Sequence, residues 1–270
     1  MVVTVVFVLI PIGFSLYLSL WKWPLIGPNR AFIGLANYSR LLRSSEFWNA
    51  IRITTLYTLG VVPLSTATAL ALALLVNRPL CGWPIYRTAY FMPVVTSTVA
   101  VAIAWKWIYN PQAGLLNGLL SAVHLPPLGW LTDPQWALPA LIIMAVWKYA
   151  GYYMVMFLAG LQTIPREYEE AAEIDGADGL ARFRHITWPL LRPTTALVVI
   201  TSTIFAFQVF GPVYVMTGGG PVRSTSVIVY HLYQRAFGFQ ELGYASAMGW
   251  ALFLLVFPLT VLQFKVISQR

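Results

Sequence analysis

The chain has 270 residues, of which 59% are hydrophobic and 10% are charged, and its formal net charge is +8. A mean hydropathy of +0.71 excludes a water-soluble domain and indicates an integral membrane protein. The basic residues are scattered along the chain, so the positive charge predicts no nucleic-acid-binding surface. The single cysteine, Cys81, excludes an intrachain disulfide, and the three widely spaced histidines form no metal-binding pattern.

Six apolar runs follow one another along the chain, each close to the length of about 20 residues that crosses a bilayer as a helix. They lack the alternation of apolar and polar residues that a membrane β-barrel strand requires. The runs occupy residues 2–21, 51–76, 89–109, 136–160, 194–217 and 245–266. We therefore predict an all-α integral membrane protein with six transmembrane helices, folded as a single domain over residues 1–270.

The first run has neither a basic leader nor a small-residue cleavage site, so we interpret it as a retained span. Its abrupt apolar start leads us to expect that a short polar leader is missing from this version of the chain. Each of the six runs contains one proline: Pro11, Pro63, Pro93, Pro139, Pro212 and Pro258. These prolines indicate either kinked helices around a pathway or only the general frequency of proline in membrane helices.

The orientation follows from a small asymmetry of lysine and arginine. If both termini share one side of the membrane, that side carries eight basic residues, and the other side carries six, with Arg52 at its boundary. The excess favours the cytoplasm for the side of the termini. We therefore expect a multi-pass protein with both termini and the connections 77–88 and 161–193 in the cytoplasm.

The fourth run contains a lysine near its centre, and a charge within a span is a candidate for function because it is costly to bury. Tyr149 and Tyr152 follow Lys148 at +1 and +4, which places the three side chains on one side of a helix. Such a surface offers aromatic stacking and hydrogen bonds to a sugar. The alternative is that Lys148 snorkels, or donates hydrogen bonds to carbonyls that a kink has freed.

The connection 161–193 holds most of the acidic residues. Six of the nine in the chain are Glu167, Glu169, Glu170, Glu173, Asp175 and Asp178. Helix signals follow in order: a start at Thr163 and Pro165, a stop at Gly176, a second start at Asp178, and a second stop at Pro189 and Pro193. The connection thus predicts a helix, a sharp turn and a second helix. It is either a surface on which a partner docks or a solvated hairpin whose charges keep it out of the bilayer.

Motifs of enzymes are absent from the sequence. None of the four lysines follows a glycine, and the Gly-rich segment 218–224 lacks a lysine, so there is no phosphate-binding loop. No catalytic set of side chains is recognisable either, and we expect no enzyme activity and no cofactor. An ion-coupled secondary transporter or channel is one function that a chain with several spans could have. Such proteins usually keep acidic residues within their spans, and the six runs contain none. A membrane scaffold would leave the pattern of 161–193 unexplained.

The acidic connection also resembles a known sequence pattern. Glu170-Ala171-Ala172, Asp175-Gly176-Ala177 and then Phe183, Ile186, Pro189 and Pro193 are similar to the EAA loop of the inner-membrane permease subunits of binding-protein-dependent ABC importers. The segment 207–255, with TGGGP at 217–221 and GYASA at 243–247, resembles the carbohydrate-uptake permeases of the maltose and glycerol-phosphate type. The resemblance covers nearly the whole chain.

This resemblance implies a role for the loop between the fourth and fifth spans. In the family it forms a cytoplasmic coupling helix that docks into a separate ATPase subunit. The residues carried over by the pattern are Glu170, Ala171, Ala172, Asp175, Gly176, Ala177, Phe183, Ile186 and Pro189. The family's fourth and fifth spans line the sugar site, which adds Ser202 and Gln208 to Lys148, Tyr149 and Tyr152 as pathway candidates.

The resemblance also implies an assembly in the bacterial inner membrane. Its expected members are a second homologous permease, which makes a heterodimer, two copies of a cytoplasmic ABC ATPase that bind ATP and Mg, and an extracytoplasmic solute-binding protein. Membrane lipid surrounds the spans. The implied cargo is an oligosaccharide, a monosaccharide or glycerol phosphate, held by this subunit or by its partner permease.

Overall fold

The computed structural model describes residues 1–77 and 83–268. Arg78 and Cys81, in the predicted connection 77–88, and Arg270 lie outside the described residues. Within those ranges, the helical segments long and apolar enough to cross a membrane are Val2–Ser19, Ser45–Val76, Ala137–Gln162 and Leu242–Lys265. Two bent pairs of helices pass the same test only as pairs. By length and composition, the described chain therefore has four candidate spans, or up to six if each bent pair is one span.

The N-terminal span leads into a short hairpin and then a long second span. The first span consists of α1 (Val2–Thr4), the π-helical turn η1 (Val5–Leu9) and α2 (Ile10–Ser19). β1 (Trp21–Lys22) pairs with β2 (Ala31–Phe32) in antiparallel fashion, and α3 (Ala36–Arg43) follows. α4 (Ser45–Val76) begins at residue 45 rather than 51. Its early start has a local cause, because Ser44 Oγ accepts a hydrogen bond from the backbone N–H of Phe47 at 3.2 Å.

The third predicted span, 89–109, is not one continuous helix. α5 (Trp83–Val95) and α6 (Thr98–Ile108) meet at 98°. Between them Ser97 has an extended ψ of 131°, and Thr96 Oγ1 donates a hydrogen bond to Met92 O at 3.1 Å. Hydroxyl side chains of this kind compete with the helical backbone for hydrogen bonds, and a count of apolar residues does not register that competition. α7 (Leu115–Ala122) follows α6.

The fifth predicted span, 194–217, is shorter than expected. α12 (Arg192–Phe207) ends at Phe207, and the π-helical turn η3 (Val213–Thr217) is separate from it. Pro212 lies between these elements, where its missing N–H prevents continuation of the helix. Upstream, α10 (Gly179–Arg182), η2 (Phe183–Thr187) and α11 (Trp188–Leu190) meet α12 at 66°. The remaining elements are α13 (Ile228–Tyr233), η4 (Gln234–Gly238) and α14 (Leu242–Ser268).

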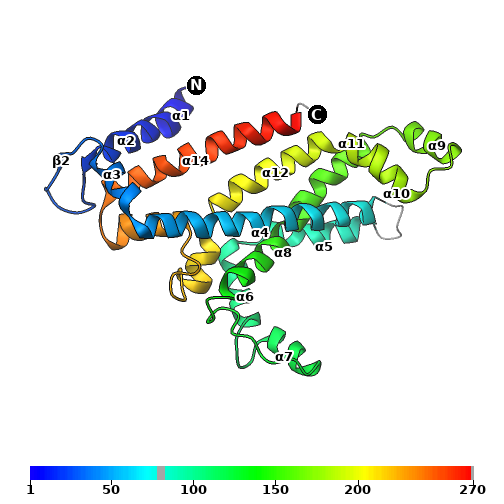
Figure 1. Ribbon diagram of the computed structural model, residues 1–270, viewed down its shortest axis with the longest axis horizontal. Helices are drawn as coiled ribbons and strands as arrows, with labels where there is room; N and C mark the ends of the chain where they lie inside the picture. Colours follow the sequence, from blue (N-terminus) through cyan, green and yellow to red (C-terminus); the bar gives the residue numbers. More distant parts are fainter. Residues whose placement is uncertain (78–82, 269–270) are drawn as a thin grey trace.

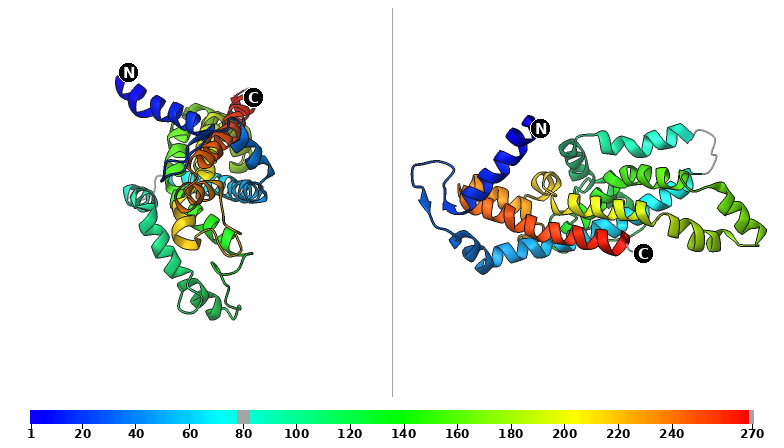
Figure 2. Two further views of the ribbon diagram at one scale, coloured as in Figure 1. Left: turned by 90° about the vertical axis from the view of Figure 1, so that its left-hand side faces the viewer. Right: turned by 90° about the horizontal axis from the view of Figure 1, so that it is seen from above.

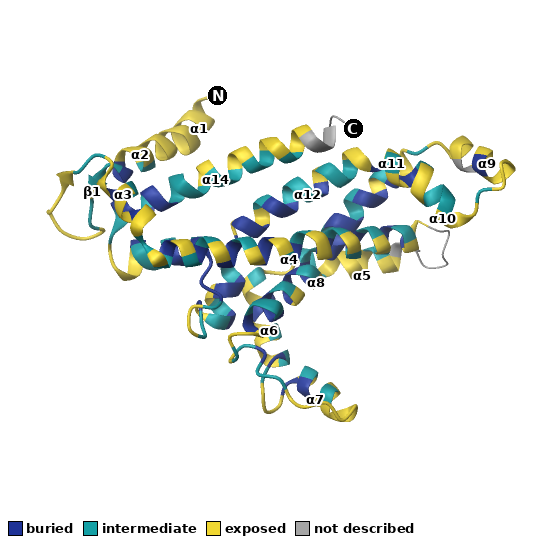
Figure 3. Ribbon diagram, viewed as in Figure 1, coloured by how far each residue is buried: buried dark blue, intermediate teal, exposed yellow. Residues whose placement is uncertain are grey.

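The centre of the bundle is the packing of α4 along α8 (Ala137–Gln162), as Figure 1 shows. α12 packs against both α4 and α14, and α14 also packs against α2. Buried side chains that include Tyr57, Tyr109 and Met144 fill one part of the core, and a second cluster contains Phe157 and Leu158. Figure 3 shows long exposed stretches on α1 and α2. Because those stretches are apolar, they suit contact with lipid or with another membrane subunit.

The two ends of the bundle carry different surfaces. β1, β2 and α3 lie at one end, and α9 (Arg166–Ile174) and α10 lie at the opposite end (Figure 1). Both chain termini point away from the end that holds the β1–β2 hairpin, and the views in Figure 2 agree. Structure outside the long helices is therefore found at the end with the β1–β2 hairpin, at the α9 end and around α7, which projects from the bundle in Figure 1.

Candidate functional site

The acidic connection forms a helical hairpin outside the spans. α9 ends at a turn in which Gly176 has a φ of +77°, a left-handed conformation that glycine adopts without strain. The N–H of Gly176 bonds to Glu173 O at 3.1 Å and that of Ala177 to Ala172 O at 2.9 Å, the pair of bonds of a Schellman motif. Asp178 Oδ1 accepts from the N–H of Ala181 at 2.7 Å and caps α10. The predicted stop and second start are therefore confirmed.

The predicted first start of this hairpin is only half right. Thr163 Oγ1 donates to Gly160 O at 2.7 Å, so Thr163 closes the last turn of α8. Pro165 occupies the N-cap position of α9 without a side-chain hydrogen bond. Proline has no polar side-chain atom that could accept a hydrogen bond from the first turn, so α9 begins without a side-chain cap.

The surface of this hairpin combines charge with exposed apolar side chains. Glu173 and Arg182 form an ion pair that links α9 to α10. Ile174 is 87% exposed and Leu180 is 74% exposed. Among the residues predicted for ATPase coupling, Ala172 is buried, Ala177, Phe183, Ile186 and Pro189 are half-buried, and Glu170, Ala171, Asp175 and Gly176 are exposed. Sequence reasoning missed Ile174 and Leu180, although both stand out as isolated apolar residues in a polar loop.

A second feature is a cavity of about 380 Å³ between the spans. It brings together three of the predicted pathway residues, Tyr149, Ser202 and Gln208. Aromatic and hydroxyl side chains that were not predicted complete much of the wall, namely Tyr57, Tyr153, Phe205, Phe210 and Thr98. The cavity lies where α12 has ended and α6 begins, so the two interruptions in the predicted spans are both at its edge. Its lining can stack on an apolar face and can exchange hydrogen bonds.

Lys148 and Tyr152 do not line this cavity. Lys148 is 1% exposed, and its Nζ donates hydrogen bonds to Pro93 O at 2.9 Å and to Thr96 O at 2.8 Å. Tyr152 packs against Phe205, with ring centroids 6.4 Å apart. Tyr149 packs against the same ring, with centroids 6.5 Å apart, so of these three side chains only Tyr149 lines the cavity, although all three are neighbours on α8.

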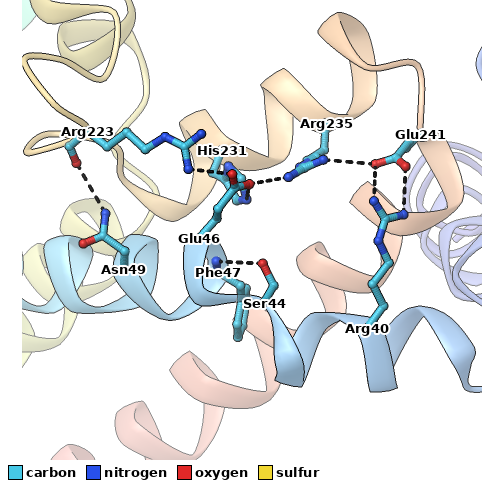
Figure 4. A network of polar contacts seen from close by, with 9 residues as sticks. All are labelled: Arg40, Ser44, Glu46, Phe47, Asn49, Arg223, His231, Arg235 and Glu241. Atoms are coloured by element: carbon cyan, nitrogen blue, oxygen red, sulfur yellow. Dashed lines mark hydrogen bonds and ion pairs between the residues drawn. The ribbon is translucent and has the colours of Figure 1, made fainter.

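The end of the bundle that holds the β1–β2 hairpin carries a continuous network of ion pairs (Figure 4). Glu46 accepts hydrogen bonds from Arg223 at 2.6 Å and from Arg235. Glu241 accepts from Arg40 at 2.8 and 3.2 Å, and it lies 3.4 Å from Arg235 Nη1. Arg235 thus joins the two glutamates. Sequence reasoning missed this network because the partners of Glu46 lie 177 and 189 residues away in the chain.

His231 lies beneath this network. It is 6% exposed, and its Nε2 has no hydrogen-bond partner among the described residues and lies 4.0 Å from Glu46 Oε2. Burial lowers the pKa of His231, and the neighbouring positive charge of Arg235 lowers it further. The hydrogen bonds to Glu241 raise the pKa of Arg40, which stays cationic. The network is thus built from fixed charges around a histidine that favours its neutral form.

Interrupted spans around a cavity, together with a helical hairpin outside the bundle, define a membrane subunit of a transport system. The family of binding-protein-dependent transport system inner membrane components matches residues 2–269. The chain belongs to this family. It is therefore a transport permease of the class found in ABC importers, and this family is one of transport components and not of enzymes.

Relatives with assigned names support the same conclusion. The chain is 36% identical to the trehalose/maltose transport system permease protein MalF of Thermococcus litoralis, over 98% of this chain and 89% of that protein. It is 38% identical to the lactose transport system permease protein LacF of Rhizobium radiobacter, over 98% and 90%. It is 34% identical to the sn-glycerol-3-phosphate transport system permease protein UgpA of Agrobacterium fabrum, over 100% and 92%.

The fold has a counterpart among solved structures. A bacterial ABC transporter involved in the import of the acidic polysaccharide alginate has a chain that superimposes with a TM-score of 0.87. The match covers 99% of this chain and 92% of that chain at 22% identity. At that level of identity the comparison supports the fold and leaves the cargo of this chain open.

Proposed function

We propose that this chain carries a sugar or sugar-like solute across the bacterial inner membrane, driven by ATP hydrolysis on a separate subunit. The named relatives transport trehalose and maltose, lactose or glycerol phosphate, so the proposed cargo is an oligosaccharide, a monosaccharide or glycerol phosphate. A solute-binding protein delivers the solute at the end of the bundle that holds the β1–β2 hairpin, and both chain termini face the cytoplasm.

The proposed pathway runs through the cavity beside α8 and α12. Tyr149 offers an aromatic face, and the Gln208 amide can both donate and accept hydrogen bonds to sugar hydroxyls. Ser202 stands at the same wall, with its Oγ 3.1 Å from Val199 O. The mixture of aromatic rings and amide or hydroxyl groups suits a solute with one apolar and one polar face.

The proposed coupling element is α9 with the turn that follows. The observation that carries this proposal is the exposure of Ile174 and Leu180 on a capped hairpin outside the spans. Large apolar side chains exposed in a group mark surfaces that another protein covers. The exposed residues Glu170, Ala171 and Asp175 lie within one turn of Ile174 along the chain, and the covering partner is the ATPase subunit, which binds ATP and Mg. The complete assembly contains two ATPases and a second permease.

A pair of matched substitutions tests the coupling surface in the complex reconstituted in lipid nanodiscs. Ile174→Ser removes an apolar side chain that is 87% exposed at the α9 end, and Val222→Ser removes one that is 88% exposed at the other end. Co-purification of the ATPase and the rate of solute-stimulated ATP hydrolysis are measured for both. We expect Ile174→Ser to reduce both quantities, whereas Val222→Ser, at the end where the solute-binding protein docks, should leave the co-purification of the ATPase unchanged. Equal co-purification of the ATPase with the two variants would assign the α9 hairpin to solvent instead of to the ATPase.

A further inference from the structure

The break in the third span is held by a side chain from another helix. α5 ends at Val95 and α6 begins at Thr98, and the two are bent by 98°. Lys148, in the middle of α8, reaches this break, and its Nζ lies 2.9 Å from Pro93 O and 2.8 Å from Thr96 O. One ammonium group therefore bonds to the last turn of α5 and to the residue that follows it.

The chemistry of this contact is that of a helix cap. The last four carbonyls of a helix have no partner within the helix, and together they carry a partial negative charge that a cation stabilises. Within a membrane no water is present to satisfy them. An ammonium group has three donors, of which two are used here, and the Tyr149 ring lies 5.5 Å from Nζ. The donors of Lys148 thus serve the backbone of the break.

A second observation at the neighbouring turn of α8 fixes the position of α5. Gly151 lies one turn beyond Lys148, and a Cβ atom at Gly151 would collide with the backbone carbonyl of Tyr90. α5 therefore packs with its backbone directly on α8 at Gly151. Contact at Gly151 sets the distance between the two helices, and hydrogen bonds from Lys148 set where α5 stops.

The position of the break decides the shape of the proposed pathway. Thr98, the first residue of α6, lines the cavity with Tyr149 and Gln208. Gly211, which follows α12, lines the same cavity, and a Cβ added there would be in van der Waals contact with Thr98 Cγ2 at 3.5 Å, so the two residues are neighbours in the wall. A shift of the break would move Thr98 and, through it, the segment that follows α12.

We propose that Lys148 is a positioning residue for transport, which holds the α5–α6 break and thereby the cavity wall at Thr98, and that it does not bind the solute. Gly151 acts with it as the seat for α5. This proposal concerns the shape of the cavity, and it holds for any solute that the cavity carries.

The test measures the break directly in the assembled complex in nanodiscs. Spin labels are placed at Ile85 on α5 and Trp107 on α6, which are 72% and 74% exposed, after Cys81→Ser removes the native thiol. Distance distributions between the labels are compared for Lys148→Met, Lys148→Arg and the control Lys265→Met. The same set of variants without labels is assayed for the maximal rate and the half-saturating solute concentration of uptake.

We expect Lys148→Met to broaden the label distances and to lower the maximal uptake rate by roughly tenfold or more, because both hydrogen bonds from Nζ to buried carbonyls are lost. Because the substitution moves the cavity wall and removes no contact with the solute, any change in the half-saturating concentration should accompany broadened label distances. Lys148→Arg should restore part of both quantities, and Lys265→Met should change neither. An unchanged distance distribution with a raised half-saturating concentration would make Lys148 a solute ligand and overturn the proposal.

A second variant covers the case in which Lys148→Met fails to assemble. Gly151→Ala leaves the lysine in place but pushes α5 away from α8, because the added methyl group meets Tyr90 O. It should broaden the same label distances and lower the maximal rate. Normal distances and normal uptake in an assembled Gly151→Ala complex would refute the role of this contact in setting the break.

Discussion

Arg235 is the residue on which the ion-pair network at the hairpin end depends, and its replacement by methionine gives a quantitative prediction. Its side chain is only 16% exposed, whereas that of Arg223 is 64% exposed. Arg235→Met removes the bonds to both glutamates, but Glu46 keeps Arg223 and Glu241 keeps Arg40. No glutamate is left unpaired, so the loss is that of charge-assisted hydrogen bonds and not of a whole buried ion pair.

The magnitude follows from the exposure of these partners. Hydrogen bonds to charged groups contribute about 1.5 to 3 kcal/mol, and the lower limit applies here because Glu46 and Glu241 are 30% and 32% exposed. We therefore expect Arg235→Met to destabilise the local structure by about 1.5 kcal/mol. Arg223→Met removes one exposed pair and should cost about 1 kcal/mol or less.

Hydrogen–deuterium exchange of the segment 228–240 in the nanodisc complex measures this difference, because local opening governs the exchange of its amides. Exchange should be roughly tenfold faster in Arg235→Met and less than about fivefold faster in Arg223→Met, since 1.4 kcal/mol corresponds to a factor of ten. Amides of α8 serve as an internal control and should not change. Equal acceleration in the two variants, or none in Arg235→Met, would refute the reasoning from burial.

Three further predictions concern the helical hairpin of α9 and α10, the cavity and the buried histidine. Gly176→Val places a β-branched residue at a φ of +77° and should lower solute uptake while ATP hydrolysis in the purified complex becomes independent of solute. Gln208→Ala should raise the half-saturating solute concentration by roughly tenfold with a smaller effect on the maximal rate, because a hydrogen bond to the solute is lost. His231 has a pKa below its usual 6.5, so the opened state binds a proton that the native state does not, and stability falls as the pH drops below about 6.5. Exchange of the segment 228–240 should accelerate between pH 7.5 and 5.5 in the wild type, and less so in His231→Gln.

Local signals in the sequence predicted the helical class and the α9 hairpin. The stop at Gly176 and the cap at Asp178 depend on residues within one or two turns of each other, so the sequence contains everything that forms them. Hydropathy likewise located the apolar segments, because bilayer thickness sets their length. Hydropathy could not show that the run 89–109 is broken. A break within a membrane depends on a neighbouring side chain that donates hydrogen bonds to the freed carbonyls, and hydropathy does not identify that donor.

The tertiary structure alone decided what the polar groups within and beside the spans do. Lys148 donates hydrogen bonds to carbonyls more than 50 residues earlier in the chain, and Arg40 pairs with Glu241, 201 residues later in the chain. No helical periodicity connects such residues, because their proximity results from the packing of α5 on α8 and of α3 against α14. The sequence by itself therefore determined the membrane class, the apolar segments and the capped hairpin through short-range hydrogen bonds and hydrophobicity. The packing of helices decided the cavity, the cap on α5 and the ion-pair network, since each requires side chains from distant segments to meet.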